Sequence, residues 1–172
     1  MNRSKCIPVL AALVALLLTS CATKAPHYDF RELARAAIAL DLDIAPEDNH
    51  QLYVTAADWI GVPYRAGGRD HRGTDCSGLV CQLFRKAYHR TLQPNAELQR
   101  TKDCRKISKK HLQEGDLVFF HNGCNRRTAS HVGIYLKGGR FIHASTTHGV
   151  IVSRLSEPYY QRHWLQGGRV IR

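Results

Sequence analysis

The chain has 172 residues, about the length of one domain. Hydrophobic residues make up 44% and charged residues 23%, which argues against a disordered, collagen-like or multi-span membrane protein. No internal repeat at solenoid or propeller spacing is visible. The charge is unusual, because 25 Lys and Arg against 14 Asp and Glu give +11 at pH 7. Nucleic acids, anionic lipids and acidic polymers are the partner classes that such a charge favours.

The first residues predict an export signal. Arg3 and Lys5 precede a nearly continuous apolar run, Ile7–Leu18, which is too short to span a hydrocarbon core of about 30 Å as a helix. A basic start, a short apolar stretch and then small residues are typical of a secretory signal peptide. Residues 18–21 (Leu-Thr-Ser-Cys) also resemble the bacterial lipobox, which implies cleavage before Cys21 and acylation of that cysteine.

This pattern divides the chain into a lipoprotein signal peptide (1–20), a lipidated Cys21 with tether and leader helix (21–50), and one domain (51–172). The alternative is a plain signal peptide, or a membrane anchor, with an incidental Cys21. Multiple acyl chains give stable anchoring, so we expect the protein at the cell envelope, on the outer membrane facing the periplasm. Export argues against a nucleic-acid partner. Residues 65–172 carry 20 basic and seven acidic side chains, which favours a polyanionic target in the envelope.

Three helices are predicted in the first half of the mature chain. Residues 30–44 place their apolar side chains on roughly one helical face, and residues 51–60 form a second periodic segment. Gly and Pro residues over 61–68 then indicate a loop. A third helix is predicted from Asp75 to about Arg90, with the apolar spacing of a buried stripe.

Strands are predicted in the second half. The candidates are Asp116–Phe120, His131–Leu136, Arg140–Ala144 and Val150–Ser153. Their glycine-containing connections are typical of an antiparallel meander, whereas residues 93–114 are polar and basic and predict no regular element. Helices followed by strands favour an α+β fold, with helices packed on an antiparallel sheet.

Cys76 is the candidate nucleophile. Asp75 is a good N-cap, so Cys76 is predicted in the first turn of a helix. The helix N-terminus favours anions, and we therefore expect a lowered thiol pKa and a reactive thiolate. Four glycines would let backbone approach a substrate there: Gly67, Gly68, Gly73 and Gly78. A lone cysteine is otherwise a small buried hydrophobe, as we predict for Cys81, about 140° around the same helix.

Two histidines on neighbouring predicted strands could supply a base and its orienting partner. Because strand side chains alternate, both rings face the same way only if the connection between the strands has an odd number of residues. A three-residue loop with Gly in the left-handed region satisfies this. His131 and His143 are then close or diagonal neighbours, about 7–8 Å apart between Cα atoms in the diagonal case. The alternative is two half-exposed strand histidines among ten.

Six segments in this order resemble the NlpC-type cell-wall cysteine peptidases (the NlpC/p-sixty group), in their lipoprotein form. The segments are Trp59–Tyr64, Gly67-Gly68, Asp75–Val80, Gly115–Phe120, Ser130–Tyr135 and Phe141–Ala144. The resemblance covers residues 51–172 and implies a papain-like fold with the catalytic cysteine at a helix N-terminus. It also implies that Cys76 is the nucleophile, His131 the base and His143 the residue that orients it.

The same resemblance implies three further site residues. Tyr64 matches a tyrosine whose hydroxyl lies in the active site, although a core aromatic is the alternative role. Asp75 and Ser77 match positions that shape the substrate cleft, although Asp75 could only cap its helix. The chain departs from the family pattern at Ala66, at residues 92–95 and in a basic insert, His121–Arg127.

These observations predict a lipid-anchored, monomeric peptidoglycan endopeptidase that needs no metal or cofactor. The resemblance implies an amide bond of the stem peptide, either γ-D-glutamyl-diaminopimelate or D-alanyl-diaminopimelate. One alternative is a non-catalytic wall-binding lipoprotein of the same fold, and another is a metal site built from Cys76, His131 and His143. A disulfide between Cys104 and Cys124 competes with two free thiols, since the exported compartment allows either.

Overall fold

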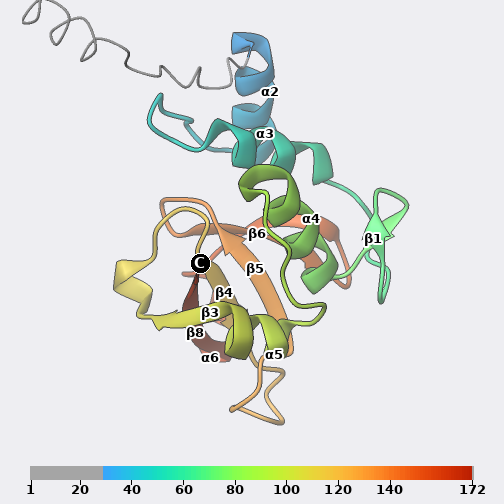
Figure 1. Cartoon of the computed structure of the whole chain (residues 1–172), viewed down its shortest axis with the longest axis vertical. Coiled ribbons are helices and arrows are strands. Elements are labelled where there is room, and N and C mark those ends of the chain that lie inside the picture. The colour runs from blue at the N-terminus through green and yellow to red at the C-terminus, as the bar shows by residue number, and fades with distance from the viewer. Residues whose placement is uncertain (1–28, 172) are drawn as a thin grey trace, which may run out of the picture.

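Helices and an antiparallel sheet pack together in the computed structural model, which describes residues 29–171 (Figure 1). The helices are α2 (Phe30–Leu40), α3 (His50–Trp59), α4 (Cys76–Tyr88), α5 (Ala96–Leu98) and α6 (Pro158–His163), with a π-helical turn at Gln99–Asp103 and a 3-10 turn at Lys109–His111. The strands are β1 (Arg69–Asp70), β2 (Gly73–Thr74), β3 (Cys104–Ile107), β4 (Leu117–Phe120), β5 (His131–Tyr135), β6 (Arg140–Ser145), β7 (Gly149–Arg154) and β8 (Trp164–Val170). The α+β class is therefore confirmed. The predicted signal peptide and Cys21 lie outside the described residues.

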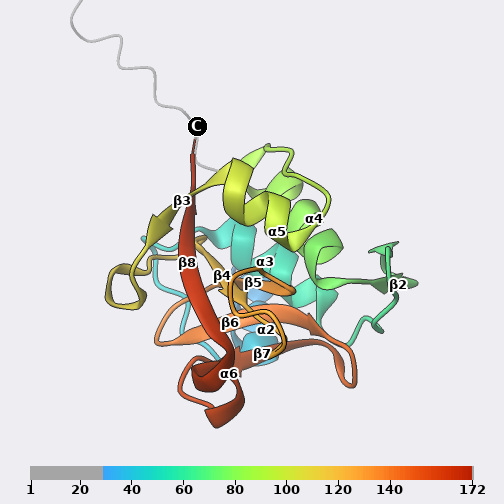
Figure 2. The same cartoon turned by 90° about the horizontal axis from the view of Figure 1, so that it is seen from below.

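The main sheet has the order β3-β8-β4-β5-β6-β7, and every neighbouring pair is antiparallel. The predicted meander is confirmed for β4 to β7. β8 was not predicted, because its Gly167-Gly168 pair is typical of a turn. In the sheet a Cβ on Gly168 would lie 2.7 Å from the Phe119 ring, so glycine lets β8 pass between β3 and β4 (Figure 2). The edge strand β3 was also missed, because its exposed Arg105 and Lys106 hide the pattern of a strand.

The first helix ends earlier than predicted. α2 stops at Leu40, because Asp41 adopts a left-handed conformation with φ of 51°. The N–H groups of Asp41 and Leu42 donate back to the carbonyls of Ile38 and Ala37, which closes the helix end, and Leu42 is buried. α3 and α4 match the prediction closely, and Asn49 and Asp75 cap their N-termini.

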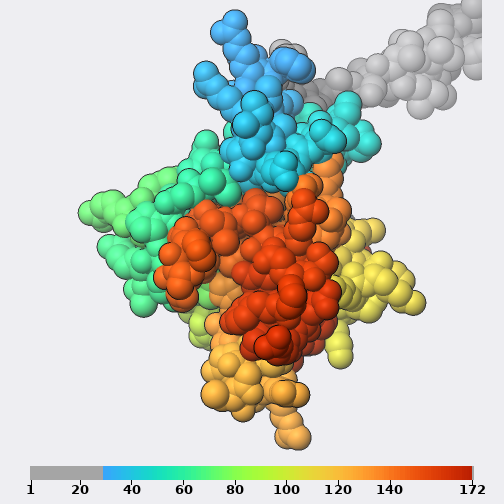
Figure 3. Space-filling view, turned by 180° about the vertical axis from the view of Figure 1, so that it is seen from behind, coloured from blue at the N-terminus to red at the C-terminus, as the bar shows by residue number. Residues whose placement is uncertain are grey.

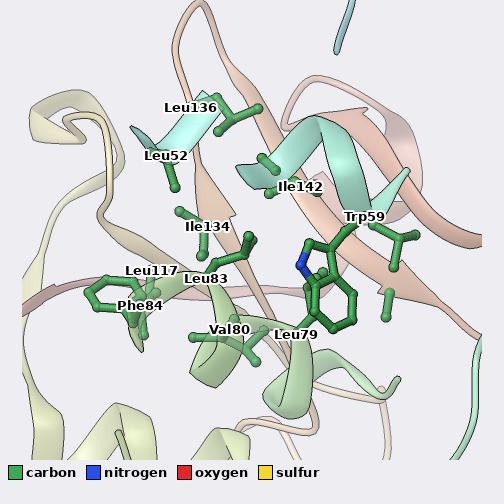
Figure 4. Packing of buried hydrophobic residues seen from close by; sticks show 14 of the residues in the cluster. Leu52, Trp59, Leu79, Val80, Leu83, Phe84, Leu117, Ile134, Leu136 and Ile142 are labelled. Atoms are coloured by element: carbon green, nitrogen blue, oxygen red, sulfur yellow. The ribbon is translucent and has the colours of Figure 1, made fainter. Parts of the chain in front are cut away.

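Two hydrophobic cores lie on opposite faces of the sheet. The larger one joins α3 and α4 to alternate residues of β4, β5 and β6, and Figure 4 shows ten of its labelled members: Leu52, Trp59, Leu79, Val80, Leu83, Phe84, Leu117, Ile134, Leu136 and Ile142. The smaller core contains the intervening strand residues together with α6: Val118, Phe120, Phe141, Leu155 and Tyr160. α4 and α6 therefore cover opposite faces. Within residues 29–171 no helix is both long and apolar enough to cross a membrane.

The proposed disulfide does not form, since Cys104 and Cys124 are both free thiols. Cys104 pairs with Val170 near one end of β8, whereas residues 121–130 leave β4 beside Trp164 at the other end. Six residues of strand separate these positions, about 20 Å at 3.3 Å per residue. A disulfide needs Cα atoms within about 7 Å, so the sheet keeps the two cysteines apart.

We predict that Cys104 and Cys124 can be alkylated separately and at different rates. Cys124 is exposed, whereas burial raises the pKa of the Cys104 thiol to about 12. Peptide mapping after a short alkylation at pH 8 should find Cys124 labelled and Cys104 largely unlabelled. After denaturation both cysteines should be labelled. Recovery of a Cys104–Cys124 cross-linked peptide from oxidatively expressed protein would contradict this.

Candidate active site

The start of α4 is built around the carboxylate of Asp75. Its Oδ1 accepts from the Gly78 N–H at 2.7 Å and from the Ser77 hydroxyl at 2.9 Å, and its Oδ2 accepts from the Gly67 N–H at 2.8 Å. The predicted N-cap is confirmed, and the carboxylate also ties the preceding loop to the helix. Cys76 therefore lies in the first turn, half-buried.

Gly68 and Gly78 allow the loop before α4 to pack directly against the first turn of that helix. A Cβ on Gly78 would lie 2.2 Å from the carbonyl oxygen of Gly68, which is a backbone atom that cannot move aside. The loop before Thr74 is thus seated directly on the first turn of α4. The predicted approach of substrate to Gly67, Gly68, Gly73 and Gly78 stays a prediction, and a Cβ on Gly67 would meet nothing within 4 Å.

The two predicted histidines meet. His131 Nε2 lies 2.9 Å from His143 Nδ1, with the ring planes at 88°. Ile134 pairs with Ile142 and Tyr135 with Phe141, and continuing this register places His143 opposite Gly133, diagonal to His131. The connection is the three-residue loop that was predicted, closed by the Leu136 N–H on the Arg140 carbonyl, and Gly138 and Gly139 have positive φ.

A glycine at position 133 lets the histidines approach. A Cβ there would lie 2.7 Å from the Ile142 carbonyl oxygen and 3.1 Å from His143 Cβ. Any side chain would therefore push β6 away from β5 at the point where the imidazoles touch. This position shares the sheet face of both histidines, as the alternation predicted.

The thiol reaches the start of β5 from the other face of the sheet. Cys76 packs against the larger core, to which Val132, the residue after His131, also belongs. His131 instead lies beside Phe120 of the smaller core, with ring centroids 6.1 Å apart. Cys76, at the start of α4, and His131, at the start of β5, therefore belong to two elements that pack against each other.

Burial decides the charge state of this pair. It raises the pKa of the Cys76 thiol to about 11, although hydrogen bonds from the backbone of Val132, Ser77 and Cys76 lower that pKa. Burial also lowers the pKa of His131 to about 4. For His143, burial and then the neighbouring His131 lower the pKa well below the usual histidine value. The predicted lowering of the Cys76 pKa is therefore wrong, and these shifts favour a neutral thiol and neutral imidazoles.

Tyr64 lies beside Cys76. It is half-buried and forms an isolated bridge with Thr74, directly before Asp75. Burial raises the pKa of its phenol, and negative charge on Cys76 or Asp75 raises that pKa further, which reflects their proximity. The tyrosine hydroxyl is thus protonated at neutral pH and available as a hydrogen-bond donor.

Ser77 is directed into the protein. Its side chain is buried, and its hydroxyl lies 2.9 Å from Asp75 and 3.0 Å from the Pro94 carbonyl. Roles for Asp75 and Ser77 in the substrate cleft stay a prediction. The departing segment 92–95 follows α4 and is held against its first turn through this contact.

Sequence reasoning missed two residues that hold the site together. Gln99 is fully buried, and its Nε2 donates to the Ser77 carbonyl at 3.2 Å and to the Gln93 carbonyl at 2.9 Å. Glu97 accepts from the Ala129 N–H at 2.7 Å, just before His131. Nothing in the polar stretch 93–114 marked them, because their partners are backbone groups distant in sequence.

The basic insert forms the approach to β5. His121 is buried, with its ring centroid 5.4 Å from that of His163. Asn122 Oδ1 accepts from the backbone N–H groups of Cys124 and Asn125, so the insert is closed by local turns. Figure 3 shows this region protruding at the end of the molecule opposite α2.

The metal hypothesis is not supported. Across residues 29–171 no group of three or more His, Cys, Asp or Glu side chains is placed to hold a metal ion. The facing nitrogens of His131 and His143 are instead bonded to each other.

The geometry and the order of the motifs agree with a family assignment. Residues 61–169 match the NlpC/P60 family. The chain belongs to this family. Its papain-like α+β fold is confirmed by solved NlpC/P60 structures, among them a family protein from Bacillus cereus with a TM-score of 0.65 and 27% identity, covering 76% of this chain and 42% of that one.

Two relatives in the NlpC/P60 family match nearly the whole chain. The protein named murein DD-endopeptidase MepS/murein LD-carboxypeptidase from Escherichia coli is 34% identical over 96% of this chain and 91% of its own length. The protein named probable endopeptidase NlpC from Escherichia coli is 37% identical over 94% of this chain and 97% of its own length.

The depressed histidine pKa values predict an acid-sensitive fold. Unfolded histidines bind protons near pH 6.5, whereas His131 and His143 stay neutral in the folded site, so the free energy of unfolding falls as pH drops from about 7 toward 4. Each histidine contributes up to about 1.4 kcal/mol per pH unit in this range. Urea unfolding at several pH values gives the free energy of unfolding as a function of pH. This free energy should depend less steeply on pH in His143→Gln than in the wild type. The exposed His148→Gln is the matched control and should keep the wild-type slope.

Proposed function

We propose that this protein is a peptidoglycan endopeptidase that cleaves stem-peptide amide bonds by a Cys-His-His mechanism. The observation that carries this proposal is the packing of α4, which begins at Cys76, against β5, which begins at His131 hydrogen-bonded to His143. Family membership supports a peptidase, and the names of the relatives supply murein as the substrate class.

The reaction starts from the neutral pair. His131 Nδ1 takes the thiol proton as the sulfur attacks the scissile carbonyl, so that a carbon–sulfur bond forms and an imidazolium results. Collapse of the tetrahedral intermediate breaks the carbon–nitrogen bond, and the imidazolium gives its proton to the leaving amine. Water then hydrolyses the thioester, with His131 again acting as base.

The first turn of α4 stabilises the developing oxyanion. In this proposal the backbone N–H groups of Cys76 and Ser77, which have no partner within the first turn of a helix, are the donors beside the carbon that the sulfur attacks. The protonated hydroxyl of Tyr64 is the third donor in this proposal. All three groups are in place before substrate binds, so they need no rearrangement in the transition state.

The D-alanyl-diaminopimelate cross-link is the preferred bond in this proposal, ahead of γ-D-glutamyl-diaminopimelate. Two relatives are named murein DD-endopeptidases, one matching 96% of this chain and the other 65%. The excess of basic side chains in residues 65–172 suits the carboxylates of the stem peptides.

We place the protein at the cell envelope, held by lipid on Cys21 to the outer membrane and facing the periplasm. The support is the sequence alone: a basic start, a short apolar run and a cysteine after small residues. A tether of a few residues then separates Cys21 from α2, so the domain works close to the membrane.

We expect Cys76→Ala to abolish cleavage and lower activity by at least about a thousandfold, since the bond-forming atom is lost. His131→Ala should lose nearly as much. His143→Ala should lose less, because water or backbone can partly replace an orienting group. Mass spectrometry of muropeptides digested by the full chain measures the products and identifies the bond.

Cys81→Ala is the matched control, because it removes a second half-buried thiol from the same helix. It should keep wild-type cleavage. Full activity in Cys76→Ala, or equal loss in the Cys81 variant, would contradict the assignment of the nucleophile.

Metabolic labelling with a palmitate analogue tests the anchor. Wild-type protein should take up the label and Cys21→Ser should not, because the acyl chains need that sulfur or the new N-terminus that cleavage creates. Cys6→Ser is the control, since it lies before the proposed cleavage point and should leave labelling intact. Label that persists in Cys21→Ser would point to a different acylation site.

A further inference from the structure

Behind the histidine pair lies a set of buried hydroxyl groups that the mechanism above does not use. His143 Nε2 is 3.0 Å from the Tyr160 hydroxyl and 3.2 Å from the Ser153 hydroxyl. Ser153 in turn donates to Tyr160 at 3.4 Å. His143, Ser153 and Tyr160 are 1%, 5% and 9% exposed, so these contacts are sheltered from water.

The chemistry of the base fixes the direction of these hydrogen bonds. His131 can accept the thiol proton at Nδ1 only if its own proton is on Nε2, where it donates to His143 Nδ1. A neutral His143 must then carry its proton on Nε2, facing the two hydroxyl oxygens. If Tyr160 or Ser153 donated to that nitrogen, the proton of His143 would move to Nδ1 and force His131 into the wrong tautomer.

The hydroxyl pair is therefore needed as an acceptor. Ser153 directs its own hydrogen to Tyr160, which leaves the lone pairs of its oxygen free for His143. The phenol oxygen of Tyr160 offers a second acceptor. Neutral oxygen dipoles thus take the place that a carboxylate has in a Ser-His-Asp triad.

The fold holds these oxygens in place. Ser153 lies on β7 opposite Phe141, on the same sheet face as His143. The Tyr160 ring packs edge-on against Phe141, with centroids 4.9 Å apart at 88°, and lies 5.2 Å from Phe120. Tyr160 is thereby locked by the smaller core, and α6 presents its hydroxyl to His143.

We propose that Ser153 and Tyr160 are positioning residues that set the tautomer of His143, and through it the tautomer of the base His131. This inference rests on the proposed Cys-His-His function. It gives the smaller core and α6 a role in positioning the base. They hold the hydroxyl acceptors at the far end of the hydrogen-bond relay that runs from His131 through His143.

Tyr160→Phe and Ser153→Ala each leave one acceptor, so each should lower kcat by less than about tenfold. The double variant leaves His143 Nε2–H without a partner and should lower kcat by about a hundredfold or more, beyond the product of the single losses. KM should stay near the wild-type value, because neither hydroxyl touches substrate. Tyr160→Phe combined with Ser153→Thr restores one hydroxyl and should recover the activity of the Tyr160 single variant.

Tyr159→Phe is the matched control, because Tyr159 is the exposed neighbour of Tyr160 and should keep wild-type kcat. Long-range 1H–15N correlation spectra at pH 7 give a second measurement that does not need activity. The His131 ring should be protonated at Nε2 in the wild type and shift toward Nδ1 in the double variant.

The proposal is overturned if the double variant keeps the Nε2–H tautomer, keeps kcat within about twofold, or loses activity through KM alone. Equal loss in Tyr159→Phe would also overturn it. A wild-type chain that cleaves no muropeptide would refute the proposed function instead, and the tautomer measurement would still test the relay.

Discussion

The contact between His131 and His143 is the constraint on which the rest of the site depends. Two neutral imidazoles 2.9 Å apart require β5 and β6 to approach more closely than side chains normally allow, which Gly133 permits. They also require burial, since hydration would stabilise the protonated imidazoles and water would compete for the hydrogen bond. The free-energy cost of keeping them neutral appears as acid sensitivity, because the unfolded chain binds protons that the folded site excludes.

The two cores position different residues of the site. The larger core holds α4 against one sheet face and so delivers Cys76 to the end of β5. The smaller core holds the aromatic surroundings of His143 on the other face. A change in either core moves one reacting partner relative to the other, so stability and geometry are linked at this strand end. This arrangement explains why a small domain covers both faces of its sheet.

The places of the candidate catalytic residues in the fold were predictable from the sequence because local rules govern them. Helix capping placed Cys76 in a first turn, and strand alternation with a three-residue loop placed His131 diagonal to His143. β8 and Tyr160 escaped prediction, because a glycine pair is typical of a turn and the role of a tyrosine on a short helix depends on tertiary contacts. The pKa of Cys76 was predicted in the wrong direction, since a helix N-terminus is visible in the sequence but the burial that outweighs it is not.

A neutral resting pair changes what the helix N-terminus does. With a standing thiolate, the N–H groups of Cys76 and Ser77 would stabilise the ground state as much as the transition state, and such uniform stabilisation does not raise kcat. With a neutral thiol, their strongest interaction comes only when negative charge develops on the attacked carbonyl. In the proposed mechanism burial therefore has two effects at once: it keeps the thiol protonated before substrate binds, and it leaves the dipole of α4 to stabilise the oxyanion. In this proposal the first turn of α4, which Asp75 caps, stabilises the oxyanion of the transition state and not a resting thiolate.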